Sequence, residues 1–77
     1  MNRTEVIKAI REECIFIRRV TDRSVASHFT INDVSLYLDE ISKIEFSGLA
    51  ISIYTKRDGN DCLAAHIMYC DIKRIGV

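Results

Sequence analysis

The chain has 77 residues, of which 48% are hydrophobic and 29% charged, and eleven basic residues balance eleven acidic ones. This length predicts one domain, and the apolar fraction without a long apolar run excludes a disordered tail and a membrane span. A formal net charge of zero gives no general attraction to nucleic acid or anionic membrane, and little repulsion between copies of the chain.

The cysteines and the first residues predict a cytoplasmic protein. Cys14, Cys62 and Cys70 are an odd number without CxxC spacing, whereas secreted domains of this size usually carry an even disulfide set. The segment 1–5 is polar and lacks the apolar stretch and cleavage site of a signal peptide.

The first third of the chain predicts a helix followed by a strand. Asn2 and Glu5 have capping-box spacing, and the apolar residues behind them lie on one helical face up to about Glu13. Residues 14–20 are rich in β-branched and aromatic side chains and predict a strand, and residues 21–24 have the composition of a turn.

The rest of the chain predicts a second helix and a hairpin. Residues 25–31 have strand periodicity, although a short helix fits them too. From the N-cap residue Asn32 onward, apolar residues recur at steps of three and four, which predicts a helix that ends before Gly48. Two strands follow, one from Leu49 and one over 62–70, joined by a turn at 57–61.

The two predicted hairpins resemble each other. Residues 15–17 match 51–53, and residues 25–29 match 63–67, which indicates an internal duplication over about 2–31 and 32–70 within a single domain, 1–77. The predicted fold class is therefore α+β, in the order α-β-β-α-β-β, with a four-stranded antiparallel sheet and both helices on one face.

Alternation along these strands assigns side chains to the two faces of that sheet. Nine residues are predicted to face the helices: Ile15, Ile17, Val25, Phe29, Ile51, Ile53, Leu63, Ile67 and Tyr69. The opposite face is too apolar to be left open to water, so it predicts a partner surface. The predicted interface residues are Phe16, His28, Tyr54, His66 and Met68.

A second interpretation of the same sequence takes residues 24–29 as a helix, with Val25, Ala26, Phe29 and Ile31 forming the first helix and turn of a helix-turn-helix. In that form the chain resembles a winged-helix DNA-binding domain. The resemblance implies that residues 32–45 form the helix that reads DNA and that 49–70 form the wing. That helix carries four carboxylates against one lysine, a charge that disfavours DNA contact.

Nucleic-acid binding therefore stands as the alternative function, by a winged helix or by a sheet platform. Its candidate residues are basic and lie around the two predicted turns: Arg18, Arg19, Arg23, Lys56 and Arg57. Asp22, Asp58 and Asp61 interrupt these clusters, which favours solvated turn charges instead.

Catalysis and metal binding find little support. Cys62, His66 and Cys70 are spaced four apart, but residues four apart on a strand are about 13 Å apart, too far for zinc ligands. Nothing orients a Cys-His nucleophilic pair, and no glycine-rich phosphate loop is present. We expect no cofactor, no small-molecule substrate and no enzymatic activity.

The sequence thus predicts a small cytoplasmic protein-protein interaction module without catalysis of its own. We expect it to bind itself, as a homodimer or larger oligomer, and to act on another protein as an accessory or regulatory protein.

Overall fold

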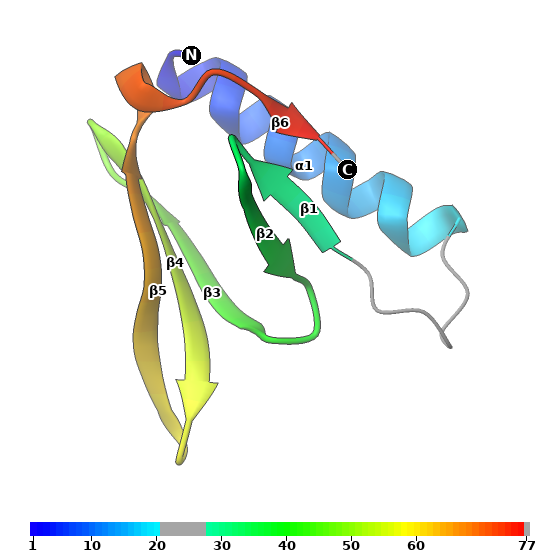
Figure 1. The fold of residues 1–77 in the computed structure, drawn as a ribbon, viewed down its shortest axis with the longest axis vertical. Coiled ribbons are helices and arrows are strands. Elements are labelled where there is room, and N and C mark those ends of the chain that lie inside the picture. The colour runs from blue at the N-terminus through cyan, green and yellow to red at the C-terminus, as the bar shows by residue number, and fades with distance from the viewer. Residues whose placement is uncertain (21–27, 77) are drawn as a thin grey trace.

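A computed structural model describes the backbone of residues 1–20 and 28–76 and the side chains of residues 1–13 and 28–76 (Figure 1). Within these ranges one helix precedes six strands and a short 3₁₀ turn. In chain order the elements are α1 (Arg3–Val20), β1 (His28–Ile31), β2 (Val34–Tyr37), β3 (Ile41–Phe46), β4 (Ala50–Arg57), β5 (Asn60–Met68), η1 (Tyr69–Asp71) and β6 (Ile75–Gly76).

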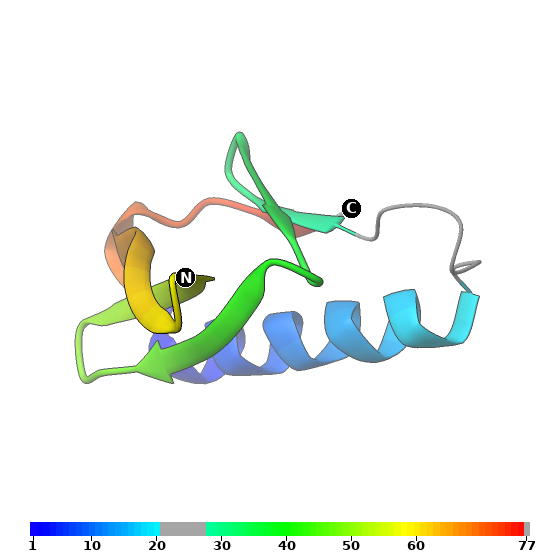
Figure 2. The ribbon, with the colours of Figure 1, turned by 90° about the horizontal axis from the view of Figure 1, so that it is seen from below.

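The strands form two antiparallel three-stranded sheets. Sheet A has the order β2-β1-β6 and sheet B the order β3-β4-β5. Helix α1 runs along one side of the molecule, as Figure 2 shows, and it contacts β1 and β6. The predicted four-stranded sheet with two helices on one face is therefore wrong, because the described chain has one helix and two separate sheets.

Helix α1 begins as the sequence predicts. The Glu5 backbone N–H donates to Asn2 Oδ1 at 2.8 Å, and the Asn2 N–H donates to Glu5 Oε1 at 3.1 Å, which is the reciprocal geometry of a capping box. Residues 14–20, predicted to be a strand, instead continue the helix to Val20. No glycine or proline interrupts this stretch, and a β-branched residue costs a helix only a few tenths of a kcal/mol.

Removing the cap is expected to weaken the fold measurably. Asn2→Ala should lower the free energy of unfolding by about 1 kcal/mol, because one donor at the helix start loses its acceptor. Lys8→Ala, on an exposed position of the same helix, should change it by less than about 0.5 kcal/mol. Urea denaturation of both variants would measure this, and equal effects would contradict the capping role.

Residues 32–45, predicted to be a helix, form strands and turns instead. Ile31 pairs with Val34, so Asn32 and Asp33 make a two-residue turn, and Asn32 has φ 55°. Asparagine tolerates this left-handed conformation better than most residues. A second turn around residues 38–40 leads into β3. In a strand, side chains on one face recur at every second residue. The two turns interrupt this alternation, so the apolar residues of the segment come to be spaced three and four apart.

The winged-helix interpretation is overturned by the same observation. Its DNA-reading helix, residues 32–45, consists of the Asn32–Asp33 turn, β2, a second turn and most of β3. The segment that could be either a strand or a short helix is described in part. Residues 28–31 form strand β1, and residues 24–27 lie outside the described residues.

The hairpin of the second half of the chain is present as β4 and β5. Asp58 and Gly59 both have positive φ, 52° and 81°, as a two-residue hairpin turn requires. The register shifts once: Ile53 lies opposite Ala65 but Tyr54 lies opposite Leu63, so Ala64 is the extra residue of a β-bulge.

The first pair of segments matched in the proposed repeat differs in secondary structure. Residues 15–17 lie on α1, whereas the matched residues 51–53 lie on β4. The single domain and the duplication over about 2–31 and 32–70 stay predictions.

The core lies between α1 and the inner faces of the two sheets. Its fully or nearly fully buried members come from every described element except β3, β5 and β6: Val6, Ile10, Phe29, Ile31, Leu36, Ile51, Ile53, Tyr69 and Ile72. One oxygen of the β3–β4 turn ties α1 and η1 to sheet B. Arg3 Nε, at the start of α1, donates to the Ser47 carbonyl at 3.2 Å, and the Tyr69 hydroxyl of η1 donates to the same oxygen at 2.5 Å.

Four predicted core residues, Phe29, Ile51, Ile53 and Tyr69, are buried as expected. Leu63 is not: it is 57% exposed, because the bulge places it opposite Tyr54 on the outer side of sheet B. Ile67 is half-buried, and the side chains of Ile15, Ile17 and Val25 lie outside the described residues.

Candidate protein-protein interface

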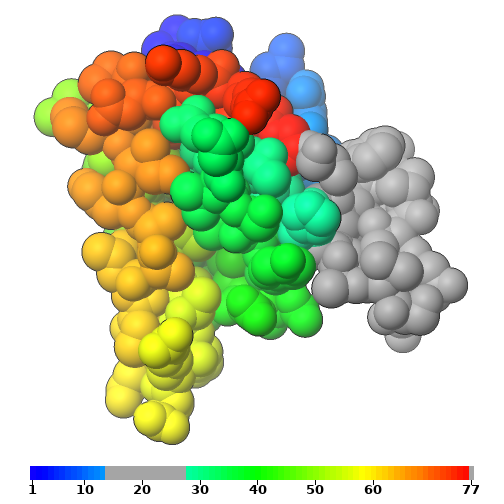
Figure 3. Space-filling view, viewed as in Figure 1, coloured from blue at the N-terminus to red at the C-terminus, as the bar shows by residue number. Residues whose placement is uncertain are grey.

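Strand β5 is an edge strand of sheet B. One side pairs with β4, and within the described residues no strand pairs with the other side. In Figure 3 the strand forms one lateral margin of the molecule. An edge strand presents N–H and C=O groups that can continue the ladder with a further strand.

The composition of β5 leaves this edge unprotected. Natural edge strands usually avoid pairing by being short, by carrying lysine or proline, or by a bulge. β5 has nine residues, and from Cys62 to Met68 it contains neither proline nor a Lys, Arg, Asp or Glu side chain. The bulge residue, Ala64, has only a methyl group as side chain. A second strand therefore meets no long or charged side chain there.

Two large apolar side chains of β5 are exposed. Leu63 is 57% and Met68 42% exposed, one on each side of the bulge. Leu49, in the turn before β4, is also exposed, and its carbonyl accepts from the Tyr69 N–H directly after Met68. Exposed apolar side chains thus lie near both ends of the uncharged part of β5.

The outer face of sheet B carries a polar network beside that edge. Ser52 lies opposite Glu45 on β3 and His66 on β5, and its hydroxyl is 2.9 Å from His66 Nδ1. The Lys43 ammonium lies 4.5 Å from the centre of the Tyr54 ring, and the Tyr54 hydroxyl donates to Glu45. All these groups come from the side of the sheet opposite buried Ile51 and Ile53.

A salt bridge within this network shifts two pKa values. Lys43 Nζ lies 2.9 Å from Glu45 Oε1. The hydrogen bond from Lys43, and then its charge, lower the pKa of Glu45, and the hydrogen bond to Glu45 raises the pKa of Lys43. The contribution of Glu45 to stability is therefore lost as the pH falls through its lowered pKa, and that of Lys43 as the pH rises through its raised pKa. Both side chains are exposed, so salt screens the pair.

The structure separates the predicted interface residues into three places. Tyr54, His66 and Met68 belong to sheet B. His28 belongs to sheet A, where its ring centre lies 5.4 Å from that of Tyr37. Phe16 lies on α1, and its side chain is outside the described residues. The common open face that was to join all five residues does not exist, because the single sheet that would form it is divided in two.

The predicted nucleic-acid residues are also dispersed. Arg18 and Arg19 lie on α1, not at a turn between strands, and Arg23 is outside the described residues. Lys56 and Arg57 lie at the tip of the β4–β5 hairpin, which Figures 1 and 2 place far from the end of α1. They line a shallow hollow together with Asp39 and Glu40, so carboxylates offset their charge. Nothing in the described part of the chain favours nucleic-acid binding over contact with protein.

The cysteine and histidine cluster weighed for zinc is not assembled. Cys62 and His66 lie on β5 and Cys70 lies in η1. Among the described side chains no group of three or more His, Cys, Asp or Glu residues is placed to hold a metal ion. Cys62 and Cys70 are exposed free thiols.

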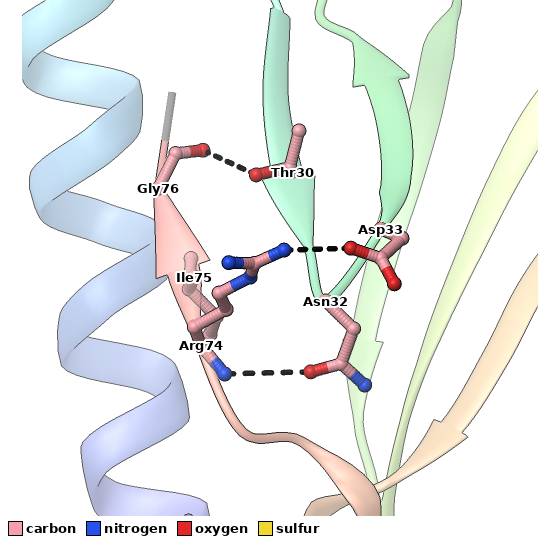
Figure 4. Close-up of a pocket in the computed structure, with 6 residues that line it drawn as sticks. All are labelled: Thr30, Asn32, Asp33, Arg74, Ile75 and Gly76. Atoms are coloured by element: carbon pink, nitrogen blue, oxygen red, sulfur yellow. Dashed lines mark hydrogen bonds and ion pairs between the residues drawn. The ribbon is translucent and has the colours of Figure 1, made fainter.

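A second hollow lies beside β6, but structural bonds occupy its polar groups (Figure 4). Asn32 Oδ1 accepts from the N–H groups of Lys73 at 2.8 Å and Arg74 at 3.3 Å, and Asn32 Nδ2 donates to the Asp71 carbonyl. The Arg74 guanidinium bonds Asp33 at 2.6 Å. This arrangement holds the end of the chain against the β1–β2 turn.

Sequence reasoning missed Leu63 as a surface residue and missed β5 as an edge. No local signal marks β5 as an edge, because the uncharged run from residue 62 to 70 lacks the lysine and proline that edge strands usually carry. No helix in the described ranges is both long and apolar enough to cross a membrane. Comparison with protein-family models, with curated proteins and with solved structures found no match.

Proposed function

We propose that this chain acts by protein-protein contact and binds a second copy of itself through β5, as an accessory or regulatory protein without catalysis of its own. The observation that carries the proposal is the open edge of β5, which is nine residues long, carries no charged side chain from Cys62 to Met68 and is accompanied by exposed Leu63 and Met68. His66 lies on β5 itself, and Tyr54 lies on the same outer face of sheet B on the neighbouring strand β4; we assign both to the interface.

Two forces favour association at this edge. Backbone N–H and C=O groups that now face water would form a ladder with the partner strand, and burial of apolar side chains contributes about 25 cal/mol per Å². The formal net charge of zero adds little repulsion between copies. The same edge could receive a strand of another protein, which would then compete with self-association.

We place this activity in the cytoplasm. Exposed Cys62 and Cys70 are compatible with a reducing compartment, where such thiols stay unpaired.

A charge at the interface is expected to separate the copies. Met68→Asp should convert the wild-type oligomer into a monomer, because pairing would bury an unpaired carboxylate. Light scattering on a sizing column, at 50 and 500 mM NaCl, would give the mass of each species. We expect the wild-type mass to be insensitive to salt, since the contact is mainly apolar and backbone-mediated.

Val34→Asp is the matched control for this experiment. Val34 is 48% exposed, close to the 42% of Met68, but it lies on β2 in sheet A. This variant should keep the wild-type mass, and circular dichroism should show that both variants are folded. A monomeric wild-type protein, or equal masses for Met68→Asp and wild type, would overturn the proposed function.

A further inference from the structure

Sheet B has a second edge, on strand β3. One side of β3 pairs with β4, and within residues 1–20 and 28–76 no strand pairs with the other side. If β5 of one copy paired with β3 of the next, each addition would leave a new edge free, and the copies would form an open chain of sheets. Association through β5 that stops at two copies therefore requires a block at β3.

The β3 edge offers few backbone groups to an added strand. Alternate residues of an antiparallel strand direct their N–H and C=O groups to the same neighbour. The Ser47 N–H donates to the Ala50 carbonyl at 2.9 Å across the β3–β4 turn. Ser47 thus faces β4, so Phe46 and Ile44 face the open edge. A register shift near the start of β3 interrupts the regular ladder before these two residues.

The side chain of Arg3 occupies part of this edge. Its Nη2 donates to the Phe46 carbonyl at 3.4 Å, and its Nε donates to the Ser47 carbonyl at 3.2 Å. The Phe46 carbonyl is one of the groups that an added strand would need as an acceptor. A strand that pairs with β3 must therefore displace the guanidinium first.

Helix stability does not account for an arginine at this position. Arg3 is the first residue of α1, where a cation is unfavourable because the helix macrodipole is positive at its N-terminus. The side chain is exposed, so it adds little to the core. Its contacts with the two carbonyls at the end of β3 give this residue a role that the helix alone does not.

We propose that Arg3 blocks the β3 edge against strand addition, so that association through β5 joins two copies and stops there. With β3 covered, β5 is the edge of sheet B that each copy offers to another. Two copies that use the same edge form a closed contact, which leaves no further edge of sheet B open. This inference rests on the proposed self-association and specifies what limits its size.

Arg3→Ala tests the block. Light scattering on a sizing column, over a range of protein concentrations, should give the mass of two copies for wild type. Arg3→Ala should give larger masses that rise with concentration. Arg11→Ala is the matched control, because it removes an exposed arginine from the same helix, and it should stay at two copies. An Arg3→Ala protein that is folded by circular dichroism and stays at two copies would overturn the inference.

A double variant separates ordered growth from aggregation of a weakened fold. Adding Met68→Asp to Arg3→Ala blocks the β5 edge as well, so this protein should be monomeric. Large species that persist would show that growth does not use the edges of sheet B, which contradicts the proposed role of Arg3.

Arg3→Lys decides the question if the alanine variant does not fold. Lysine keeps the charge and the aliphatic stem but lacks the planar fork that reaches both carbonyls. This variant should also exceed two copies, and a mass fixed at two copies would count against the block.

The wild-type mass separates this inference from the function it rests on. A monomeric wild type would overturn self-association itself. A wild-type dimer whose mass Arg3→Ala leaves unchanged would overturn only the role of Arg3. A wild-type mass above two copies would show that the β3 edge is not blocked.

Discussion

Alanine in place of Leu36 is expected to lower the free energy of unfolding by about 2 to 4 kcal/mol, the usual range for removing a buried leucine side chain. Leu36 is 7% exposed and lies opposite Phe29 in sheet A, inside the core. Truncation would leave a cavity between the sheets and α1. A domain of this size has a total stability of only about 4 to 12 kcal/mol, so the loss should be plain in urea denaturation.

Leu63→Ala is the matched control, because it removes the same atoms from a residue that is 57% exposed. We expect a loss below about 1 kcal/mol, measured at a protein concentration low enough for the chain to be monomeric. The fold predicted from sequence reverses the burial of these two residues. In its helix over residues 32–45, Leu36 lies off the apolar face, and in its four-stranded sheet Leu63 faces the helices. Equal effects, or a larger loss for Leu63→Ala, would therefore contradict the described fold and favour the sequence-based one.

Asn32→Ala is expected to lower the free energy of unfolding by about 2 to 3 kcal/mol, from two separate causes. Alanine adopts the positive φ of 55° at a cost of about 1 kcal/mol more than asparagine. The amide also makes three hydrogen bonds, to the backbone of Asp71, Lys73 and Arg74. These are solvent-accessible bonds, so each is worth at most about 1 kcal/mol and water replaces part of it.

Asn32→Gly separates the two causes. Glycine tolerates positive φ but cannot make the side-chain bonds, so it should lose about 1 kcal/mol less than alanine. Thermal unfolding followed by circular dichroism would compare the two variants with wild type. If glycine and alanine were equally destabilising, the backbone conformation at residue 32 would carry no cost, and the described turn would be wrong.

Stability and association should respond to different residues. Leu36→Ala removes buried contacts on sheet A and leaves the β5 edge unchanged, so its folded fraction should associate like wild type. Met68→Asp changes an exposed residue of that edge and should leave monomer stability within about 0.5 kcal/mol. A protein in which both substitutions altered both properties would indicate that folding and association are one process.

Part of the fold could be predicted from local sequence because local interactions specify it. The capping box needs only residues two to five, whose bonds are with one another. The β4–β5 hairpin has a turn signal, Asp58-Gly59, between two alternating segments. In β4, Ile51 and Ile53 face the core as alternation predicts.

For the site, Tyr54, His66 and Met68 were predicted on one strand pair and are found there. His28 and Phe16 were added through a four-stranded sheet that does not form. Whether a strand is an edge depends on which strands lie beside it, and no local pattern in β5 contains that information.

By itself, the sequence determined the start of α1, the last hairpin and much of the core. Only the tertiary structure decided residues 14–20 and 32–45, where β-branched residues and spacings of three and four fit both a helix and a strand. The Asn32–Asp33 turn is stabilised by bonds to residues 71–74, about forty positions away in sequence. Burial of Leu36 likewise requires Phe29 and the other core elements. Because distant contacts contribute more free energy than the small difference between local propensities, the fold of residues 32–45 follows from packing.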